Sequence, residues 1–398
     1  MYTNVNLTSR TFDFIIAGGG IAGFSLAYHL INSPLRDCSI LVVDKDLTIR
    51  NDRTLSFWAD RPTLFDAIVY HTWNQVRFVG EEFERTVDLN SFRYKMIRGA
   101  DFFHFVHQAL TTCPNVVLLQ GTIERIDDGD DGASIVVNGH TYKGKWVFDS
   151  LFNFAHFQPD SSRYSYLCQS FKGWEIETVE PVFDPQTATL MDFRTPQKQD
   201  MRFFYVLPVS EHRALVEYVL LERDNCNQAL RNYIENVLGI KQYQIVYREG
   251  GVTPLSDRPF RRQIGQHIMT IGIQGGRAKP SSGYVFSRIQ ADSAAIVQSL
   301  LTAGHPFDIS STPLPYRLCD SMMLQIMARH GERIKPLFTF LFKRNPVERI
   351  FKFLDEVTSL WEVFLLGASL VFPVMSARFV PSGAPASGLK PALRQSSH

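Results

Sequence analysis

Residues Gly18 to Gly23 form a glycine turn with the pattern Gly-x-Gly-x-x-Gly. The turn follows an apolar run, Phe12 to Ala17, and precedes a helical stretch, which is the context in which this pattern binds a dinucleotide. Gly18 would permit the tight turn, Gly20 the close approach of a pyrophosphate, and Gly23 the close packing of helix against strand. The residues therefore predict a phosphate-binding turn at a helix N-terminus.

An acid follows this turn at the expected distance. Asp44 ends the next apolar run, Ser39 to Val43, about 20 residues beyond Gly23, where a carboxylate accepts hydrogen bonds from a ribose hydroxyl. The alternative is a glycine-rich turn without a ligand, because glycines alone also serve tight turns. We predict a dinucleotide site, and the motif does not separate FAD from NAD.

A second acid, Glu217, lies in the apolar run Ala214 to Val219. In an extended strand Leu215 and Glu217 share one face, and Val216 and Tyr218 share the other. The alternation leaves two interpretations open. Glu217 is either a solvent-facing charge or a carboxyl buried in an apolar sheet, where desolvation keeps it neutral near pH 7 and able to donate a proton.

The elements that must position these residues indicate an α/β protein. Strands are expected over 12–17, 39–43, 116–126, 133–137 and 145–149, with helices at 24–32 and 100–111. Between 165 and 221 the runs Ala188 to Met191, Phe203 to Leu207 and Arg213 to Leu221 predict an antiparallel sheet. From about Asp320 the pattern becomes helical.

The predicted elements divide the chain into domains that are discontinuous in sequence. We assign 11–60, 100–155 and 262–300 to a Rossmann-type dinucleotide-binding domain, and 61–99 and 156–261 to a substrate domain built on the antiparallel sheet. Residues 301–380 form a helical region, and 381–398 are expected to be a disordered tail.

Composition excludes several classes of function. With 41 Lys and Arg against 40 Asp and Glu, no field of one sign is available to attract nucleic acid. Five scattered cysteines without a Cys-x-x-Cys pair argue against a disulfide framework and structural zinc, and favour a cytoplasmic protein. The His104 and His107 spacing is typical of an exposed helix face, so no metal is predicted.

The aromatic content, 13% with 31 Phe, suits either a Phe-rich core or a large apolar ligand. Nowhere do about twenty apolar residues run together, so no spanning helix is predicted. The region from Leu337 to Phe379 combines Phe and Leu with Lys and Arg, and indicates either a membrane-docking surface or helices that cover the core.

Several segments resemble the FAD-dependent lycopene cyclases. The likeness runs from Phe12 to about Phe379 and is most specific in a central block. Its segments are Asn51 to Trp58, Phe171 to Glu177, Glu180 to Pro185, Leu190 to Arg194, Ala214 to Val219, Gly272 to Gly276, and Lys279 to Tyr284 with Arg288.

The resemblance implies roles for particular residues. Glu217 falls on the family's catalytic acid, in a segment that often reads Phe-Leu-Glu-Glu-Thr, and Tyr218 here replaces the second acid. Thr54 would lie near the flavin, although its segment could also be a loop with a core Trp. The late glycine turn would contact the flavin through Gly272, Gly275, Gly276, Ser282 and Gly283.

The implied activity is closure of the acyclic ends of lycopene, or a related acyclic carotene, to β rings. Glu217 would donate the proton, reduced FAD and aromatic faces such as Phe57, Trp58 and Tyr205 would stabilise the cation, and NADPH or NADH would reduce the flavin. Such an enzyme would sit at the inner face of the cell membrane. The number and type of rings and the oligomeric state stay open.

Alternatives remain. Glu175, Glu177 and Asp192 are further candidates for acid or proton acceptor, or are paired or solvated charges. Flavin hydroxylases and reductases usually carry Gly-Asp-Ala in the late turn, and no acid lies between Gly272 and Arg277. This favours a cyclase over an FAD-dependent reductase or hydroxylase of a polyprenoid or aromatic substrate, and a carotenoid carrier without turnover is the other rival.

Overall fold

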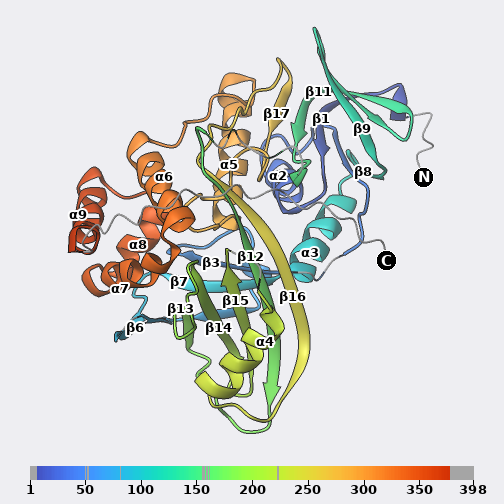
Figure 1. Cartoon of the computed structure of the whole chain (residues 1–398). Coiled ribbons are helices and arrows are strands. Elements are labelled where there is room, and N and C mark those ends of the chain that lie inside the picture. The colour runs from blue at the N-terminus through green and yellow to red at the C-terminus, as the bar shows by residue number, and fades with distance from the viewer. Residues whose placement is uncertain are drawn as a thin grey trace.

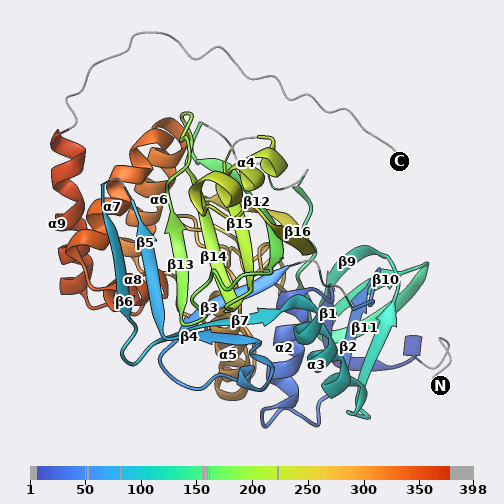
Figure 2. The same ribbon diagram turned by 90° about the horizontal axis from the view of Figure 1, so that it is seen from below.

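The computed structural model describes residues 7–376, except 50, 52, 81, 155–156, 158–159, 161 and 222–223, with side chains up to 369. The expected tail, 381–398, lies outside the described residues. Figures 1 and 2 show three parts: a nucleotide-binding-type unit at one end, a long, mostly antiparallel sheet, and a group of C-terminal helices at the other end.

The first sheet has a parallel core with two added antiparallel strands. Its order is β8 (Val116–Gln120), β2 (Ile40–Asp44), β1 (Thr11–Ala17), β11 (His140–Asp149), β10 (Gly132–Val137) and β9 (Ile123–Gly129), and β17 (Ile268–Thr270) also pairs with β11. Neighbours from β8 to β11, and the β11–β17 pair, are parallel, whereas β9, β10 and β11 are joined antiparallel.

Both faces of this sheet are buried, which explains its continuous apolar strands. Phe14, Ile16 and Val42 pack on one face against α2 (Ile21–Ile31), α3 (Gly99–Thr111) and α5 (Phe286–Ala303). Ile15 and Leu41 pack on the other face, against side chains of β10. The predicted strand over 116–126 is two strands, because the chain turns at Gly121 and Thr122.

The second sheet carries the predicted antiparallel strands and receives four more. Its order is β16 (Tyr243–Ser256), β12 (Tyr166–Thr178), β15 (Arg213–Leu220), β14 (Arg202–Ser210), β13 (Thr187–Asp192), β5 (Gln75–Val79) and β6 (Glu84–Asp88). All neighbours are antiparallel except β13 and β5, which run parallel. Part of one face is covered by α4 (Cys226–Asn232) and the π-helical turn η3 (Tyr233–Val237).

A third, three-stranded sheet joins segments that the sequence assigned to different units. β3 (Thr54–Ala59), β7 (Arg93–Arg98) and β4 (His71–Trp73) are antiparallel, and the short helix η1 (Asp66–Ile68) precedes β4. Phe57 of β3 packs with the α5 side of the first sheet, whereas Trp58 belongs to the core beneath the second. This small sheet therefore connects the two large ones.

The C-terminal region is helical, as predicted, but begins earlier than Asp320. It contains α6 (Leu314–Arg329), η4 (Gly331–Arg333), α7 (Ile334–Arg344), α8 (Val347–Leu354) and α9 (Leu360–Ser376). Leu337, Phe338 and Phe342 of α7 are buried against the second sheet. Among the described helices, none is long and apolar enough to cross a bilayer.

Candidate active site and cofactor cleft

The predicted glycine turn lies between β1 and α2 in a shape that requires its glycines. Gly18 has φ +104°, in the region that favours glycine. A Cβ on Gly23 would lie 1.9 Å from the carbonyl oxygen of Gly18, whereas a Cβ on Gly20 would meet nothing within 4 Å. Gly23 thus lets the helix approach the strand, and Gly20 leaves the backbone open to a ligand.

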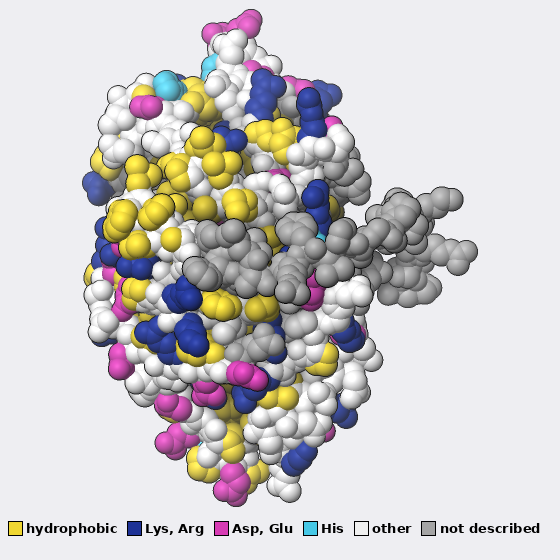
Figure 3. Space-filling view, turned by 60° about the vertical axis from the view of Figure 1, so that its left-hand side comes forward, with side chains coloured by type: hydrophobic (Ala, Val, Ile, Leu, Met, Phe, Trp, Pro, Cys, Tyr) yellow, Lys and Arg dark blue, Asp and Glu magenta, His cyan; other side chains and the backbone are white. Residues whose placement is uncertain are grey.

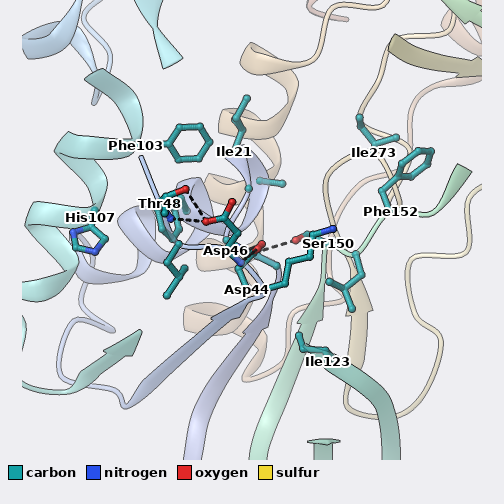
Figure 4. Close-up of a pocket in the computed structure, with 18 of the residues that line it drawn as sticks. Ile21, Asp44, Asp46, Thr48, Phe103, His107, Ile123, Ser150, Phe152 and Ile273 are labelled. Carbon is teal, nitrogen blue, oxygen red and sulfur yellow. Dashed lines mark hydrogen bonds between the residues drawn. The ribbon is translucent and has the colours of Figure 1, made fainter. Parts of the chain in front are cut away.

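Asp44 lies directly against this turn. Its Oδ2 accepts a hydrogen bond of 2.7 Å from the backbone N–H of Gly19, and its Oδ1 one of 3.0 Å from Asp46. The turn, Asp44 and the α3 side chains Phe103 and His107 surround a cavity of about 420 Å³ (Figure 4). A carboxylate beside open backbone at a helix N-terminus fits the ribose and pyrophosphate of a dinucleotide.

The late glycine turn packs against the start of α2. Gly272 has φ +62°, and a Cβ there would lie 2.6 Å from Cβ of Ala22. Gly275 and Gly276 shape the far side of this turn, where added Cβ atoms would meet the Thr270 carbonyl and the Phe260 ring at 2.6 and 2.5 Å. They line neither the dinucleotide cavity nor the cavity described next.

A second cavity, of about 540 Å³, continues from the first. Ile21, Arg53, Phe152, Ile273 and Val285 line both. The second is also lined by three predicted cofactor residues, by Glu217 and by aromatic rings: Thr54, Ser282, Gly283, Tyr94, Phe154, Phe171, Tyr205, Tyr284 and Phe286. The predicted acid and the predicted cofactor residues therefore meet at one place.

Glu217 faces this cavity because of the strand alternation. Its neighbour Tyr218 points to the other side of the sheet, where its ring stacks on Phe204 and its hydroxyl lies 3.3 Å from Nη1 of Arg202. The solvent-facing interpretation of Glu217 is therefore wrong. Tyr218, at the position of the second acid of the family's motif, does not line the cavity of Glu217.

A second carboxyl lies beside Glu217 that the sequence analysis did not identify. In the strand register Glu217 is opposite Gly173 of β12, and Gly173 is opposite Glu249 of β16. The two glutamates thus flank a glycine in one cross-strand row, on one face of the sheet. Oε2 of Glu249 accepts a 2.7 Å hydrogen bond from Oγ1 of Thr54.

Burial and like charge favour a neutral Glu217. Burial, followed by the neighbouring charge of Glu249 and their hydrogen bond, raises the pKa of Glu217 well above its usual value. Burial also raises the pKa of Glu249, although hydrogen bonds from Glu217, Thr54 and Tyr247 oppose this. Of the two carboxyls, Glu217 is therefore the one that favours its protonated form more strongly.

Three tyrosines surround the acid. The hydroxyls of Tyr205 and Tyr284 are 3.0 Å apart, and the buried Tyr94 joins the same cluster. Burial raises the pKa of all three phenols, that of Tyr284 to about 12, so they are neutral near pH 7. Of the aromatic residues proposed to face the cation, Tyr205 lines the cavity of Glu217, whereas Phe57 and Trp58 line a separate one.

The other candidate acids have structural partners or lie outside the cavity. Glu175 is buried and forms ion pairs with Arg213 at 2.6 Å and Arg98 at 3.4 Å. Asp192 pairs with Arg194 at 2.5 Å and accepts a hydrogen bond from the Tyr233 hydroxyl. Glu177 is exposed. These arrangements favour Glu217 as the acid.

Solved structures share this fold over most of their length, a flavoprotein among them. The chain resembles a flavoprotein/dehydrogenase from Cytophaga hutchinsonii, with a TM-score of 0.64 at 12% identity over 92% of this chain and 98% of that one. It also resembles a geranylgeranyl bacteriochlorophyll reductase-like protein from Thermoplasma acidophilum, with a TM-score of 0.59 at 15% identity over 92% and 98%. At these identities the likeness shows the fold.

The sequence, unlike the fold, identifies a protein family. The sequence profile of the lycopene cyclase protein family matches residues 13–379, and the chain belongs to this family. A curated relative, the chloroplastic neoxanthin synthase of Solanum lycopersicum, is 21% identical over 334 residues, which cover 75% of this chain and 62% of that protein. The chain thus spans somewhat under two thirds of that relative.

Proposed function

We propose that this protein is an FAD-dependent lycopene β-cyclase, which closes the acyclic ends of lycopene to β rings without net oxidation or reduction. The observation that supports this most is a half-buried carboxyl, Glu217, that faces an aromatic-lined cavity continuous with the dinucleotide cleft, where desolvation raises its pKa. Membership of the lycopene cyclase family supports the choice of substrate.

The chain's own residues can carry each step of the reaction. Glu217 gives its proton to a terminal carbon–carbon double bond, whose π electrons form the new C–H bond and leave a carbocation. A second double bond attacks the cation and closes the ring. A neighbouring carbon then loses a proton to the carboxylate, so the atoms and electrons of the substrate are only rearranged.

The cleft fits FAD. The open backbone at Gly20 would receive the pyrophosphate, Asp44 the ribose, and the region of Thr54, Ser282 and Gly283 the flavin ring. Oγ of Ser282 is buried and has no hydrogen-bond partner among the described residues, as expected of a group that meets a ligand. Bound reduced FAD would supply negative charge beside the cation, with NADPH or NADH as the reductant.

We also propose that the C-terminal helices dock on the inner face of the cell membrane, from which a water-insoluble polyene must be taken. Leu314, Leu318 and Met322 form a stripe along α6 and are 60, 55 and 64% exposed. Leu360, Trp361 and Phe364 at the start of α9 are 76, 65 and 61% exposed. Large apolar side chains this exposed, on one part of the surface, are typical of an interaction site.

The two apolar groups lie together. The hydroxyl of Tyr316 in α6 contacts Thr358, just before α9, at 2.9 Å to the carbonyl oxygen. Figure 3 shows hydrophobic side chains gathered on this side of the molecule, with Lys and Arg beside them. Lys343, Arg344 and Lys352 of α7 and α8 supply positive charge that suits an anionic bilayer.

The test is an anaerobic assay of purified protein with FAD, excess NADPH and lycopene in liposomes, followed by chromatography and mass analysis of the carotenoids. Monocyclic or bicyclic isomers of unchanged mass are expected from the wild type. Glu217→Gln should abolish them, and Glu177→Gln, an exposed glutamate on the same sheet, should not. A product that differs by two hydrogens or one oxygen would overturn the proposal in favour of a reductase or hydroxylase.

A further inference from the structure

Glu249 is a buried ionisable residue beside Glu217. The reaction described above gives Glu249 no role. The inference that follows rests on the proposed function, because it concerns how Glu217, the proton donor, is oriented and kept protonated. Glu249 comes from β16, and Glu217 from β15, with β12 between them. Their approach therefore depends on what β12 places in the row.

Gly173 of β12 provides the space. A Cβ at this position would lie 2.9 Å from Cγ of Glu249 and 3.0 Å from Cδ1 of Leu215. Any side chain here would push Glu249 away from the row. With glycine, the side chain of Glu249 lies across β12, over Gly173 and towards Glu217 on the far strand.

The two oxygens of Glu249 differ in their surroundings. Oε2 accepts the hydrogen bond from Thr54, whereas Oε1 is buried and accepts no hydrogen bond from the described residues. A buried acceptor without a donor is unfavourable. The O–H of a protonated Glu217 supplies the donor that Oε1 lacks.

We propose that Glu217 and Glu249 form a carboxylic acid–carboxylate pair that shares one proton, with Glu249 as the positioning residue that orients the Glu217 carboxyl and keeps it protonated. Two adjacent carboxyl groups do not both ionise readily, because the two negative charges would repel each other. Thr54 stabilises the carboxylate member of the pair through its hydroxyl.

The pair also accounts for the later steps. When the proton passes from Glu217 to the polyene, the Glu217 carboxylate faces the new carbocation, and Glu249 adds a second negative charge behind it. The neighbouring carbon then releases its proton, and its C–H electron pair forms the ring double bond. That proton returns to the two carboxylates, whose mutual repulsion favours its capture, so the pair ends the cycle with one proton as it began.

The other ionisable groups around the pair leave this assignment intact. Tyr94, Tyr205 and Tyr284 face Glu217 as neutral phenols. The Tyr247 hydroxyl donates to the Asn51 carbonyl oxygen at 2.9 Å. Glu175, the next acid along β12, forms ion pairs with Arg213 and Arg98. Arg53 lines the same cavity.

The test is the pH dependence of lycopene turnover by the FAD-loaded enzyme. Glu249→Gln keeps the size of the side chain but removes the charge, so Glu217 loses its proton at lower pH. We expect the alkaline limb of the pH–rate profile to move down by about one unit, with roughly a tenfold loss at pH 8 and little loss at pH 6.

A second variant shifts the limb in the opposite direction. Thr54→Val removes the hydrogen bond that stabilises ionised Glu249, so the pair holds its proton more tightly and the limb moves to higher pH. Opposite shifts from two variants cannot arise from general structural damage. An equal loss of rate at every pH in both variants, or an unshifted limb in both, would overturn the pair.

A measurement without turnover separates this inference from the proposed function. Infrared spectra of the purified protein, recorded as pH is raised, should contain a carbonyl band of a protonated carboxyl that persists at pH 7–8. The band should be absent in Glu217→Gln and disappear at lower pH in Glu249→Gln. If the band behaves so but lycopene is not cyclised, the proposed function fails and the pair stands; if the wild type cyclises lycopene without such a band, the pair fails.

Discussion

Trp58 and Asp355 join the small third sheet to the C-terminal helices. The indole Nε1 of Trp58 donates a 2.6 Å hydrogen bond to Oδ2 of Asp355, which lies just beyond the end of α8. The Trp58 ring also stacks on Phe351 of α8, with centroids 4.5 Å apart and planes 3° apart. One side chain of β3 thus holds the helical region by a polar and an apolar contact.

This contact predicts a pH-dependent stability. Burial raises the pKa of Asp355 to about 6 in the folded protein, against a usual value of 3.8. Because the folded state binds this proton more tightly, its stabilising effect is present below about pH 4 and is lost as pH rises through 6. Asp355→Asn keeps an acceptor for Trp58 without the charge, and should stabilise the protein by roughly 1–2 kcal/mol at pH 7.5.

Thermal unfolding of the two proteins from pH 4 to pH 8 measures this effect. The difference in melting temperature should be small at pH 4 and grow towards pH 8. A difference of the same size at every pH would show that the carboxylate is not the cause.

Gly20 and Gly23 of the first glycine turn should respond differently to replacement by alanine. Gly23→Ala places a Cβ 1.9 Å from the Gly18 carbonyl, so we expect a large loss of stability and of bound FAD. Gly20→Ala meets no described atom within 4 Å and has φ −76°, so the fold should persist while the methyl group obstructs the pyrophosphate. FAD affinity should fall by roughly tenfold or more, equivalent to about 1.4 kcal/mol.

Flavin absorbance per protein and a FAD titration measure binding, and thermal unfolding of the apoprotein measures the fold. If Gly20→Ala binds FAD as tightly as the wild type, the pyrophosphate does not lie against this turn.

Lys279 joins α6 to the segment that follows α8. Its fully buried Nζ lies 3.1 Å from Oδ2 of Asp320 and 3.1 Å from Oε1 of Glu356. Lys279→Met leaves buried carboxylates without this partner, and should destabilise the protein by about 3–5 kcal/mol. Arg125→Met, which breaks the exposed ion pair with Asp127, is the control and should leave the melting temperature unchanged.

Denaturant unfolding together with limited proteolysis before α6 would detect the loosened helices. If Lys279→Met unfolds like the control, the buried cluster does not hold the helical region.

The proposed membrane surface predicts that bilayer binding is lost when its apolar side chains are replaced by charged ones. Trp361→Asp combined with Phe364→Asp should lower the fraction that sediments with anionic liposomes, by roughly tenfold in affinity, because two large apolar groups no longer enter the bilayer. Val179→Asp, 76% exposed beyond the end of β12, is the matched control. Equal sedimentation of the wild type, the double variant and the control would exclude this surface as the docking site.

Local sequence determined the cofactor turn. The glycines and Asp44 lie within one strand–helix–strand unit, so short-range spacing is enough to place the acid against the turn. The α/β fold and the family were predicted correctly for the same reason, since apolar runs and the central block are continuous in the chain. Alternation along one strand also set Glu217 and Tyr218 on opposite faces.

Only the tertiary structure decided what those faces meet. Whether Glu217 faces solvent or a cavity depends on packing between the second sheet and the late turn, and whether a second carboxyl joins it depends on the register of three strands. Glu249 carries no local signal, because it meets Glu217 only across Gly173. Pairings between distant strands are set by the burial of whole faces, which no short window of sequence contains.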